Sequence, residues 1–339
     1  MSEKLVVGDL AIPKGEMKRG AIKGVELANN VAVDIPFLAM NGAEDGPTLL
    51  LMSTQHGIEI QGIEVIHRVM RDELDPKKLR GAVIGVPVGN PLAFMHHQYL
   101  SWIDNLDVGT VRCDRPNGNT TERLASALWE GAWSKADYIV NIHCNTRPDS
   151  LIYQWINTGN PETRDDLVKM ADAFGATTIV SDRAPGEDAP PTLGNKASWK
   201  GVPVILEELI DGRWISEPST SAGVRGVLNI MKAYDMIDGD VEPQEGFPIV
   251  PGVNRFHGVI RCARGGLIRF FKVPGELFAE GEPLAEIYDL YGDVIEEVKM
   301  PVEGYVWAYP CGQSLGTSGG LQAVQSGANI AYAFTHESD

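Results

Sequence analysis

A histidine and a glutamate three residues apart follow the first strongly apolar run of the chain. His56 and Glu59 lie between residues 48–52, which predict a buried strand, and residues 60–70, whose apolar positions have near-helical spacing. Residues three apart at the start of a helix can turn to the same side, so both side chains can reach one metal ion. Alone the pattern is weak, because the helix dipole also favours a glutamate at this place.

A second histidine stands at the end of another apolar segment. Residues 138–142 predict a buried strand, and His143 follows them, with the polar residue Asn145 two positions on. Strand ends of an open α/β sheet meet at one edge, so His143 is expected beside the first pair. Two imidazoles and one carboxylate leave a fourth position for water, as in a catalytic zinc site; a histidine held by nearby backbone groups is the alternative. Cys144 is expected to point away.

Two adjacent carboxylates end a third apolar segment. The strand predicted at residues 202–207 ends with Glu207, and Glu208 follows it directly. Burying two acids is unfavourable unless they are paired or take part in chemistry. Adjacent residues of a strand face opposite sides of the sheet, so only one of the two can face the predicted metal site. The spacing of apolar residues does not show which one, because both faces of a central strand are apolar. One of the two is therefore a candidate proton acceptor, with a salt-bridged strand end as the alternative.

The order of the apolar segments predicts the fold class. Between residues 47 and 209, short apolar runs alternate with helix-like stretches, which indicates an α/β domain with a mostly parallel sheet. Residues 239–252 are rich in Asp, Glu, Pro and Gly, which is typical of a linker. The short runs beyond it, separated by glycine and proline turns, predict a small all-β unit. The predicted domains are residues 1–245, with an N-terminal β segment, and residues 246–339.

Composition and charge disfavour several classes of protein. The chain has 339 residues and a formal net charge of −17, which opposes binding to nucleic acid or to an anionic membrane surface. Its first residues lack the basic and then apolar pattern of a signal peptide, and no run reaches the roughly 18 apolar residues of a membrane span. Its four cysteines are scattered, so reduced thiols are expected. We therefore expect a cytoplasmic protein without nucleic-acid or membrane partners.

The segments that carry the candidate ligands and the two glutamates, taken in their order along the chain, resemble the succinylglutamate desuccinylase and aspartoacylase family. Members of this family are distant relatives of the zinc carboxypeptidases. The resemblance covers nearly the whole chain. It is carried by His56-Gly-x-Glu with Gly62 beyond it, Asn90-Pro91 after the next strand, the strand that ends in His143, and Gly201-x-Pro203 running to a glutamate.

The resemblance implies a site and an architecture. One zinc ion per chain would be bound by His56, Glu59 and His143, and the Gly-x-Pro stretch would place the catalytic glutamate at Glu208 rather than Glu207. The implied fold is an α/β, zinc-carboxypeptidase-like mixed sheet with helices on both faces. A small C-terminal all-β domain of barrel-sandwich type would follow it.

The chain departs from the family pattern where the substrate is held. Members typically carry an arginine soon after the Asn-Pro pair and then an Asn-Arg pair, whereas this chain has Tyr99 and then Gly109-Thr110. The substrate is therefore expected to differ from N-acetylaspartate and succinylglutamate. Arginines can grip a carboxylate with two hydrogen bonds, which makes nearby ones candidate anchors. The candidate substrate-binding residues are Arg147, Arg112, Arg115, Tyr99 and Asn145.

The expected activity is hydrolysis of the amide bond of a small N-acyl amino acid or N-acyl amine by metal-activated water, with Glu208 as general base and acid. A metallocarboxypeptidase acting on peptides is the alternative enzyme, and a non-catalytic metal-containing binding protein of the same fold is the alternative class. The expected partner is a small-molecule N-acyl substrate. The sequence leaves the oligomeric state open and allows a homo-oligomer.

Overall fold

The computed structural model describes residues 4–145, 151–186, 188–210, 213–309 and 323–336. Its strands are β1 (Lys4–Val7), β2 (Leu10–Pro13), β3 (Glu16–Glu26), β4 (Ala32–Asn41), β5 (Glu44–Ser53), β6 (Arg80–Val86), β7 (Tyr138–Cys144), β8 (Tyr153–Asn157), β9 (Thr177–Ser181), β10 (Val204–Leu209), β11 (Asn254–Arg261), β12 (Gly266–Phe270), β13 (Leu277–Phe278), β14 (Pro283–Tyr288), β15 (Val294–Lys299), β16 (Gly304–Ala308), β17 (Ala323–Val324) and β18 (Asn329–His336). Its α-helices are α1 (Gln61–Arg68), α2 (Pro91–Phe94), α3 (Thr120–Gly131), α4 (Arg164–Phe174), α5 (Leu193–Trp199) and α6 (Ser219–Ala233).

A large mixed sheet runs through the molecule. Within the described residues its strand order is β13-β16-β18-β11-β9-β8-β10-β7-β5-β6-β4-β3. The central strands β10, β7, β5 and β6 are parallel, while β8 runs antiparallel to β10 and β4 runs antiparallel to β6. The parallel centre agrees with the alternation in the sequence. The antiparallel neighbours make the sheet mixed.

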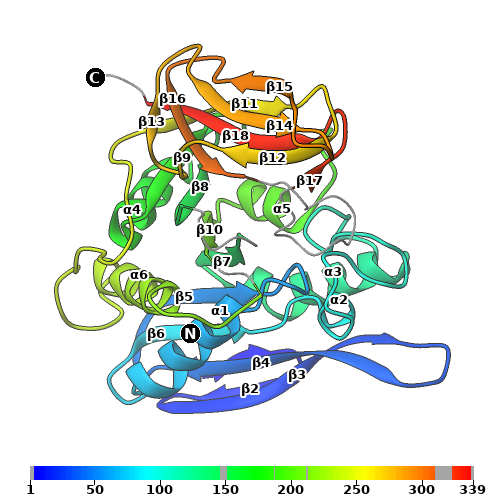
Figure 1. The fold of residues 1–339 in the computed structure, drawn as a ribbon. Coiled ribbons are helices and arrows are strands. Elements are labelled where there is room, and N and C mark those ends of the chain that lie inside the picture. Colours follow the sequence, from blue (N-terminus) through cyan, green and yellow to red (C-terminus); the bar gives the residue numbers. More distant parts are fainter. Residues whose placement is uncertain (1–3, 146–150, 187, 211–212, 310–322, 337–339) are drawn as a thin grey trace.

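Helices cover both faces of the sheet (Figure 1). Along β5, Leu49 and Leu51 pack into a core with α1, α4 and α6, whereas Leu50 and Met52 pack into a second core with α3 and α5. Side chains alternate across a strand, so a strand with helices on both sides must be apolar at every position. This explains why the run at residues 48–52 shows no polar alternation.

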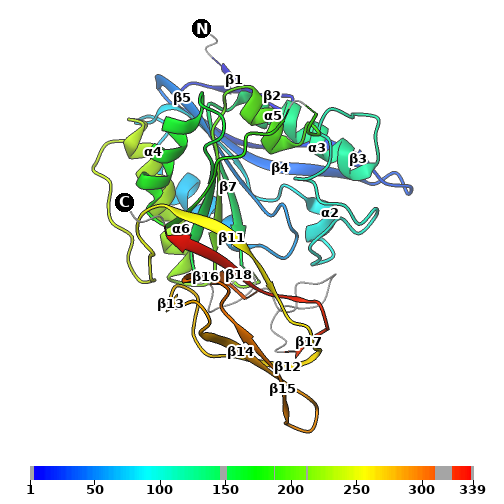
Figure 2. The same cartoon turned by 90° about the horizontal axis from the view of Figure 1, so that it is seen from above.

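The first strands form a separate edge of the sheet. The β3–β4 hairpin reaches past the helices beside it (Figure 2), and β4 joins the hairpin to the sheet through β6. The strands β1 and β2 pair with each other and bury Val7 and Ile12 in the core beneath α3. These strands confirm the β character expected of the opening segment.

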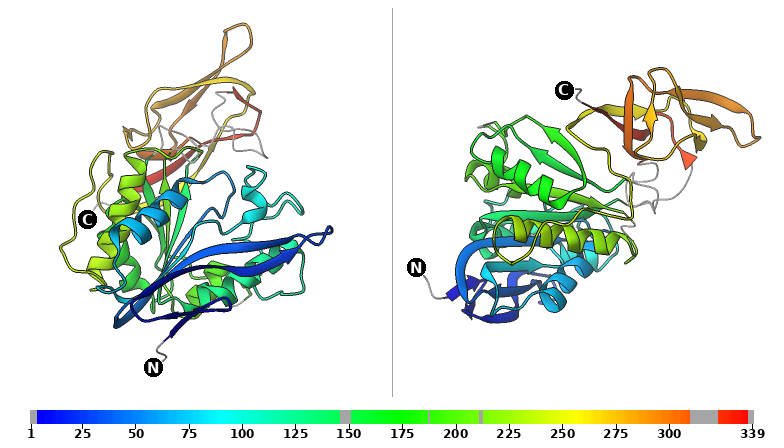
Figure 3. Two further views of the ribbon diagram at one scale, coloured as in Figure 1. Left: turned by 90° about the horizontal axis from the view of Figure 1, so that it is seen from below. Right: turned by 90° about the vertical axis from the view of Figure 1, so that its left-hand side faces the viewer.

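The described residues from Asn254 onward form strands and no helix (Figure 3). Strand β11 pairs with β9 at Asn254 and Arg255, and β18 and β16 follow, so they continue the large sheet. A second sheet, β15-β14-β12-β17, packs around its own apolar core. Within the described residues, no helix has the length and apolarity needed to cross a membrane.

Candidate metal centre

A tight loop after β5 carries the first two candidate ligands. Thr54 lies in the left-handed region with φ 54°, which is unfavourable for a β-branched residue and turns the chain sharply at the end of the strand. Its Oγ1 donates to the carbonyl oxygen of Glu59 (3.1 Å), and the Glu59 amide donates to the carbonyl of His56 (3.0 Å). The loop therefore folds back on itself and brings both side chains to one side.

Two glycines allow this loop to pack closely. A Cβ at Gly57 would lie 2.1 Å from the carbonyl carbon of Ala93 in α2, a backbone atom that cannot move aside easily. A Cβ at Gly62 would lie 2.3 Å from Oγ of Ser53. The lack of a side chain at both glycines permits this close approach, which fixes the loop between β5 and α2.

The three candidate ligands come together in the interior. The Nδ1 atom of His56 lies 2.8 Å from Oε1 of Glu59, and Nδ1 of His143 lies 2.9 Å from Oε2 of the same carboxylate. One ligand atom from each residue lies within 4.8 Å of the others, and all three residues are buried. A divalent ion fits this set of two imidazoles and one carboxylate, which matches the donors that zinc prefers.

The electrostatics of the three residues suit a cation. Burial alone would lower the pKa of His56, but the carboxylates of Glu59 and Asp107 outweigh it and raise the pKa to about 10. Burial would raise the pKa of Glu59, but His56 and His143 outweigh it and lower the pKa to about 2. The pocket therefore holds a proton between acid and imidazole, and a metal ion that binds there must displace it.

Groups behind the imidazoles fix their orientation. Nε2 of His56 lies 3.2 Å from Oδ2 of Asp107, whose Oδ1 accepts hydrogen bonds from the Gly109 amide (2.8 Å) and from Nε2 of Gln55 (3.1 Å). When Nε2 of His56 donates a hydrogen bond to Asp107, the other ring nitrogen, Nδ1, is available to bind a metal ion. On the other side, Asn141 places Nδ2 3.0 Å from Nε2 of His143.

The amide of Asn141 bears on how His143 binds. Among the described residues its Oδ1 is buried without a hydrogen-bond partner. Its Nδ2 donates to Oε1 of Gln55 (3.2 Å) and to Nε2 of His143, which places the ring proton of His143 on Nδ1, toward Glu59. A metal ion that binds Nδ1 of His143 must displace this proton.

The pairing of β10 with β7 separates the two adjacent acids. Glu208 is the register partner of His143, and Glu207 is the partner of Ile142, so the two carboxylates face opposite sides of the sheet. Burial and, after it, the charge of Glu59 raise the pKa of Glu208 well above its usual value. Glu208 therefore stands on the side of the ligands.

The candidate substrate residues fall into two groups. Tyr99 stacks on the ring of His56, with ring centroids 3.7 Å apart and planes 13° from parallel, and Asn145 is buried near the end of β7. Arg112 is paired with Asp114 (2.6 Å) and Arg115 with Glu122 (3.0 Å). Arg147 lies outside the described residues. The structure thus places Tyr99 against His56 and buries Asn145 two residues after His143, while Arg112 and Arg115 are engaged in local ion pairs.

Sequence reasoning missed several residues at this site. Asn141 could have been found, because it lies two positions before His143 and therefore on the same face of the strand. Asp107 and Gln55 are brought together by a contact across 52 positions, which no local pattern signals. Tyr153 of β8 is the antiparallel register partner of Glu208, which depends on the strand order of the sheet.

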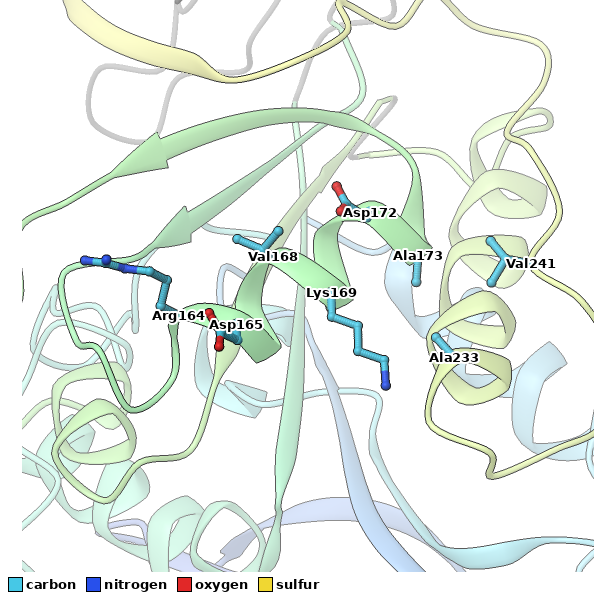
Figure 4. Close-up of a pocket in the computed structure, with 8 residues that line it drawn as sticks. All are labelled: Arg164, Asp165, Val168, Lys169, Asp172, Ala173, Ala233 and Val241. Carbon is cyan, nitrogen blue, oxygen red and sulfur yellow. The ribbon is translucent and has the colours of Figure 1, made fainter. Parts of the chain in front are cut away.

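A pocket of about 560 Å³ lies elsewhere, between α4 and α6 (Figure 4). It is lined by Arg164, Asp165, Val168, Lys169, Asp172, Ala173, Ala233 and Val241. Beside it, the ammonium group of Lys169 lies 4.0 Å from the ring centre of Tyr234. None of the lining residues is a candidate ligand or substrate residue, so this pocket is separate from the metal centre.

Comparisons with known proteins assign the chain to a family. Residues 45–234 match the family model of the succinylglutamate desuccinylase/aspartoacylase catalytic domain, and the chain belongs to this family. The matched segment contains all three candidate ligands and Glu208. Members of the family are deacylases that hydrolyse carbon–nitrogen bonds.

Relatives extend the likeness over most of the chain. An N-alpha-acetyl-L-2,4-diaminobutyric acid deacetylase of Halomonas elongata is 23% identical over 274 residues, which is 80% of this chain and 79% of the relative. The solved succinylglutamate desuccinylase/aspartoacylase of Rhodobacter sphaeroides has a TM-score of 0.78 and 25% identity, covering 97% of this chain and 98% of its own. The ectoine utilization protein EutE (DoeB) of Ruegeria pomeroyi, in a product-bound structure, has a TM-score of 0.78 at 20% identity, covering 96% and 97%.

Proposed function

We propose that this protein is a zinc-dependent deacylase that hydrolyses the amide bond of a small N-acyl amino acid or N-acyl amine. The observation that carries the proposal is the buried group of His56, Glu59 and His143 with Glu208 as the strand neighbour of His143. Two imidazoles and a carboxylate would hold one zinc ion and leave a place for water and substrate.

Glu208 is proposed as the group that handles the proton. A bound zinc ion would lower the pKa of water and polarise the acyl oxygen of the amide. Glu208 would accept the proton of the attacking water and deliver it to the leaving amine. Its pKa is raised by burial and by Glu59, so the carboxyl group can keep the proton until the amine takes it. The products are a carboxylic acid and a free amine.

The choice of an N-acyl substrate rests on the family and on one relative. The family name includes enzymes that remove succinyl and acyl groups, and the Halomonas relative is named as a deacetylase of an N-acetylated diamino acid. The loss of the arginine and the Asn-Arg pair, replaced by Tyr99 and Gly109-Thr110, supports a substrate other than N-acetylaspartate. We propose a small molecule of this type as the partner of the site.

The metal assignment is tested by zinc content. Purified protein should hold about one zinc ion per chain, and His56→Ala or His143→Ala should lose it, because each removes one of three protein ligands. Elemental analysis measures the content, with His67→Ala, a change on α1 outside the ligand group, as the matched control. Full zinc retention in both ligand variants would refute the assignment.

The activity is tested by a panel of N-acetylated and N-succinylated amino acids and amines, with release of the free amine as the readout. Zinc-loaded wild-type protein should release amine from at least one of them, and the two ligand variants should not. A zinc-loaded wild type without activity on any amide of the panel would contradict the proposed function.

We also propose that residues 246–339 form a barrel-sandwich domain distinct from residues 1–245. The separate apolar core around β12, β14 and β15 supports this division. The continuous pairing of β11 with β9 argues that the boundary is not a flexible one.

A further inference from the structure

One loop between α2 and α3 contacts the ring of His56 at two places, and we call its residues 99–107 the clamp loop. Tyr99, at its start, stacks on the imidazole, with ring centroids 3.7 Å apart and planes 13° from parallel. Asp107, at its end, places Oδ2 3.2 Å from Nε2 of the same ring. The clamp loop therefore contacts the face of the imidazole with one residue and its edge with another.

The clamp loop is closed by its own backbone. The amide of Ser101 donates to the carbonyl of Leu106 (3.0 Å), and the amide of Asn105 donates to the carbonyl of Ser101 (2.9 Å). These bonds join the segment that follows Tyr99 to the segment that precedes Asp107. The positions of the two contacts on the imidazole are thus fixed relative to each other.

A buried asparagine anchors the clamp loop to α2. Oδ1 of Asn90 accepts hydrogen bonds from Oγ of Ser101 (3.3 Å) and from the amide of Ala93 (3.1 Å). The backbone of Ala93 in turn lies against Gly57, the residue that follows His56. The clamp loop, α2 and the loop of His56 therefore pack as one unit.

The stack leaves no space between the two rings. Carbon atoms in van der Waals contact are about 3.5–4.0 Å apart, and the ring centroids of Tyr99 and His56 are 3.7 Å apart. No atom of a substrate fits between them, so one face of the Tyr99 ring is occupied by the imidazole. A substrate group can reach only the other face or the rim of this ring.

We propose that Tyr99 is a positioning residue that fixes the plane of the His56 imidazole for metal binding at Nδ1, and that it does not anchor the substrate. The inference rests on the metal centre of the proposed function. The hydrogen bond to Asp107 directs the edge of the ring but leaves rotation about the bond open, and the stacked ring of Tyr99 opposes that rotation. A ligand that is already oriented loses less conformational entropy when the metal ion binds.

The first test measures zinc affinity by competition with a chelator. Tyr99→Leu removes the flat ring but keeps an apolar side chain, and the affinity should fall about three- to tenfold, the range expected for the loss of one aromatic contact. Tyr99→Phe keeps the ring and should stay within about twofold of wild type. Trp102→Leu is the matched control and should also stay within about twofold, because Trp102 lies in the same loop but contacts His96.

A second readout follows the arrangement of the ligands directly. Cobalt(II) bound in place of zinc has a visible absorption spectrum that depends on the geometry of its ligands. Tyr99→Leu should change this spectrum, whereas Tyr99→Phe and Trp102→Leu should keep that of wild type. Denaturant unfolding of the metal-free variants checks that each retains one cooperative transition.

Three outcomes overturn the inference. Unchanged zinc affinity in Tyr99→Leu shows that the stack does not orient the ligand. An equal loss in Tyr99→Phe assigns the effect to the hydroxyl group and not to the ring. With any substrate of the amide panel, KM raised at least about tenfold in Tyr99→Leu at unchanged zinc affinity assigns Tyr99 to substrate binding.

Failure of the proposed function gives a different result. A zinc-loaded protein that hydrolyses no amide of the panel contradicts the deacylase function, and the zinc affinities of the Tyr99 variants still decide the inference. If wild type binds no zinc, or His56→Ala retains it, nuclear magnetic resonance of the metal-free protein decides. Ring protons of His56 that lie over the face of Tyr99 should be shifted upfield in wild type and in Tyr99→Phe, and less so in Tyr99→Leu. An ordinary chemical shift of these protons in wild type overturns the inference.

Discussion

Two adjacent glutamates of β10 lie on opposite faces of the sheet and have different surroundings. Glu208 faces the side of the candidate ligands, because it is the register partner of His143. Glu207 faces the helices: it is fully buried, its register partner on β8 is Gln154, and within the described residues neither of its oxygens has a hydrogen-bond partner. Burial and then the charge of Glu208 raise the pKa of Glu207 well above its usual value. Two neighbours in sequence therefore have different environments.

The largest expected effect is on kcat, which should depend on Glu208 and not on Glu207. Glu208→Gln keeps the shape of the side chain but removes the proton acceptor, so kcat should fall by at least about a hundredfold while zinc stays bound. Glu207→Gln is the matched control and should keep kcat within about twofold of wild type. If Glu207→Gln is the inactive variant, the two faces have the opposite roles.

A second, smaller effect is expected on the affinity for zinc, and it compares an aspartate near the candidate ligands with one on the helix-covered face. Asp107→Asn on the site face removes the carboxylate that orients His56, and the affinity for zinc should fall by about 10- to 100-fold. On the helix face, Asp166 accepts a hydrogen bond from the hydroxyl of Tyr234 (2.8 Å), and Asp166→Asn should leave zinc affinity unchanged. Competition with a chelator measures both, and equal losses would show that the effect is not local to the site.

The smallest effect concerns stability and its pH dependence. Because the pKa of Glu207 is raised in the folded protein, its contribution to stability is fully present below the unfolded value of 4.5 and is lost as pH rises through the folded pKa. Glu207→Gln cannot ionise, and its amide can donate to the unpartnered Oε1 of Gln154. The variant should be more stable than wild type by at least about 1 kcal/mol at pH 8 and should show a weaker pH dependence.

Denaturant unfolding at pH 5 and pH 8 measures this difference. A variant that is less stable than wild type at both pH values would indicate that the carboxyl group of Glu207 makes a favourable contact as the neutral acid.

The sequence was sufficient to predict that His56, Glu59 and His143 come together, because their signals are local. A histidine and a glutamate three apart after an apolar run, and a histidine at the end of another, needed only the rule that strand ends meet at one edge. The strands β5, β7 and β10 were each visible as continuous apolar runs. This much of the α/β centre follows from residue order alone.

Other parts of the site depend on long-range pairing. The choice between Glu207 and Glu208 could not be made from β10 itself, because the register with β7 decides which face each occupies. Trp307 of β16 lies against Tyr153 only because β18 and β16 continue the sheet beyond β11. The antiparallel direction of β8, which makes the sheet mixed and places Tyr153 beside Glu208, had no signal in the sequence.

The pairing of β11 with β9 has a consequence for shortened forms of the protein. Strand β9 is bonded to β8 on one side, and on the other side Asn254 and Arg255 pair with Ile179 and Val180. Ending the chain at residue 245 would leave this side of β9 as a bare edge with free amide and carbonyl groups. Such an edge is a template for pairing with other chains, so the C-terminal strands also protect the molecule from aggregation.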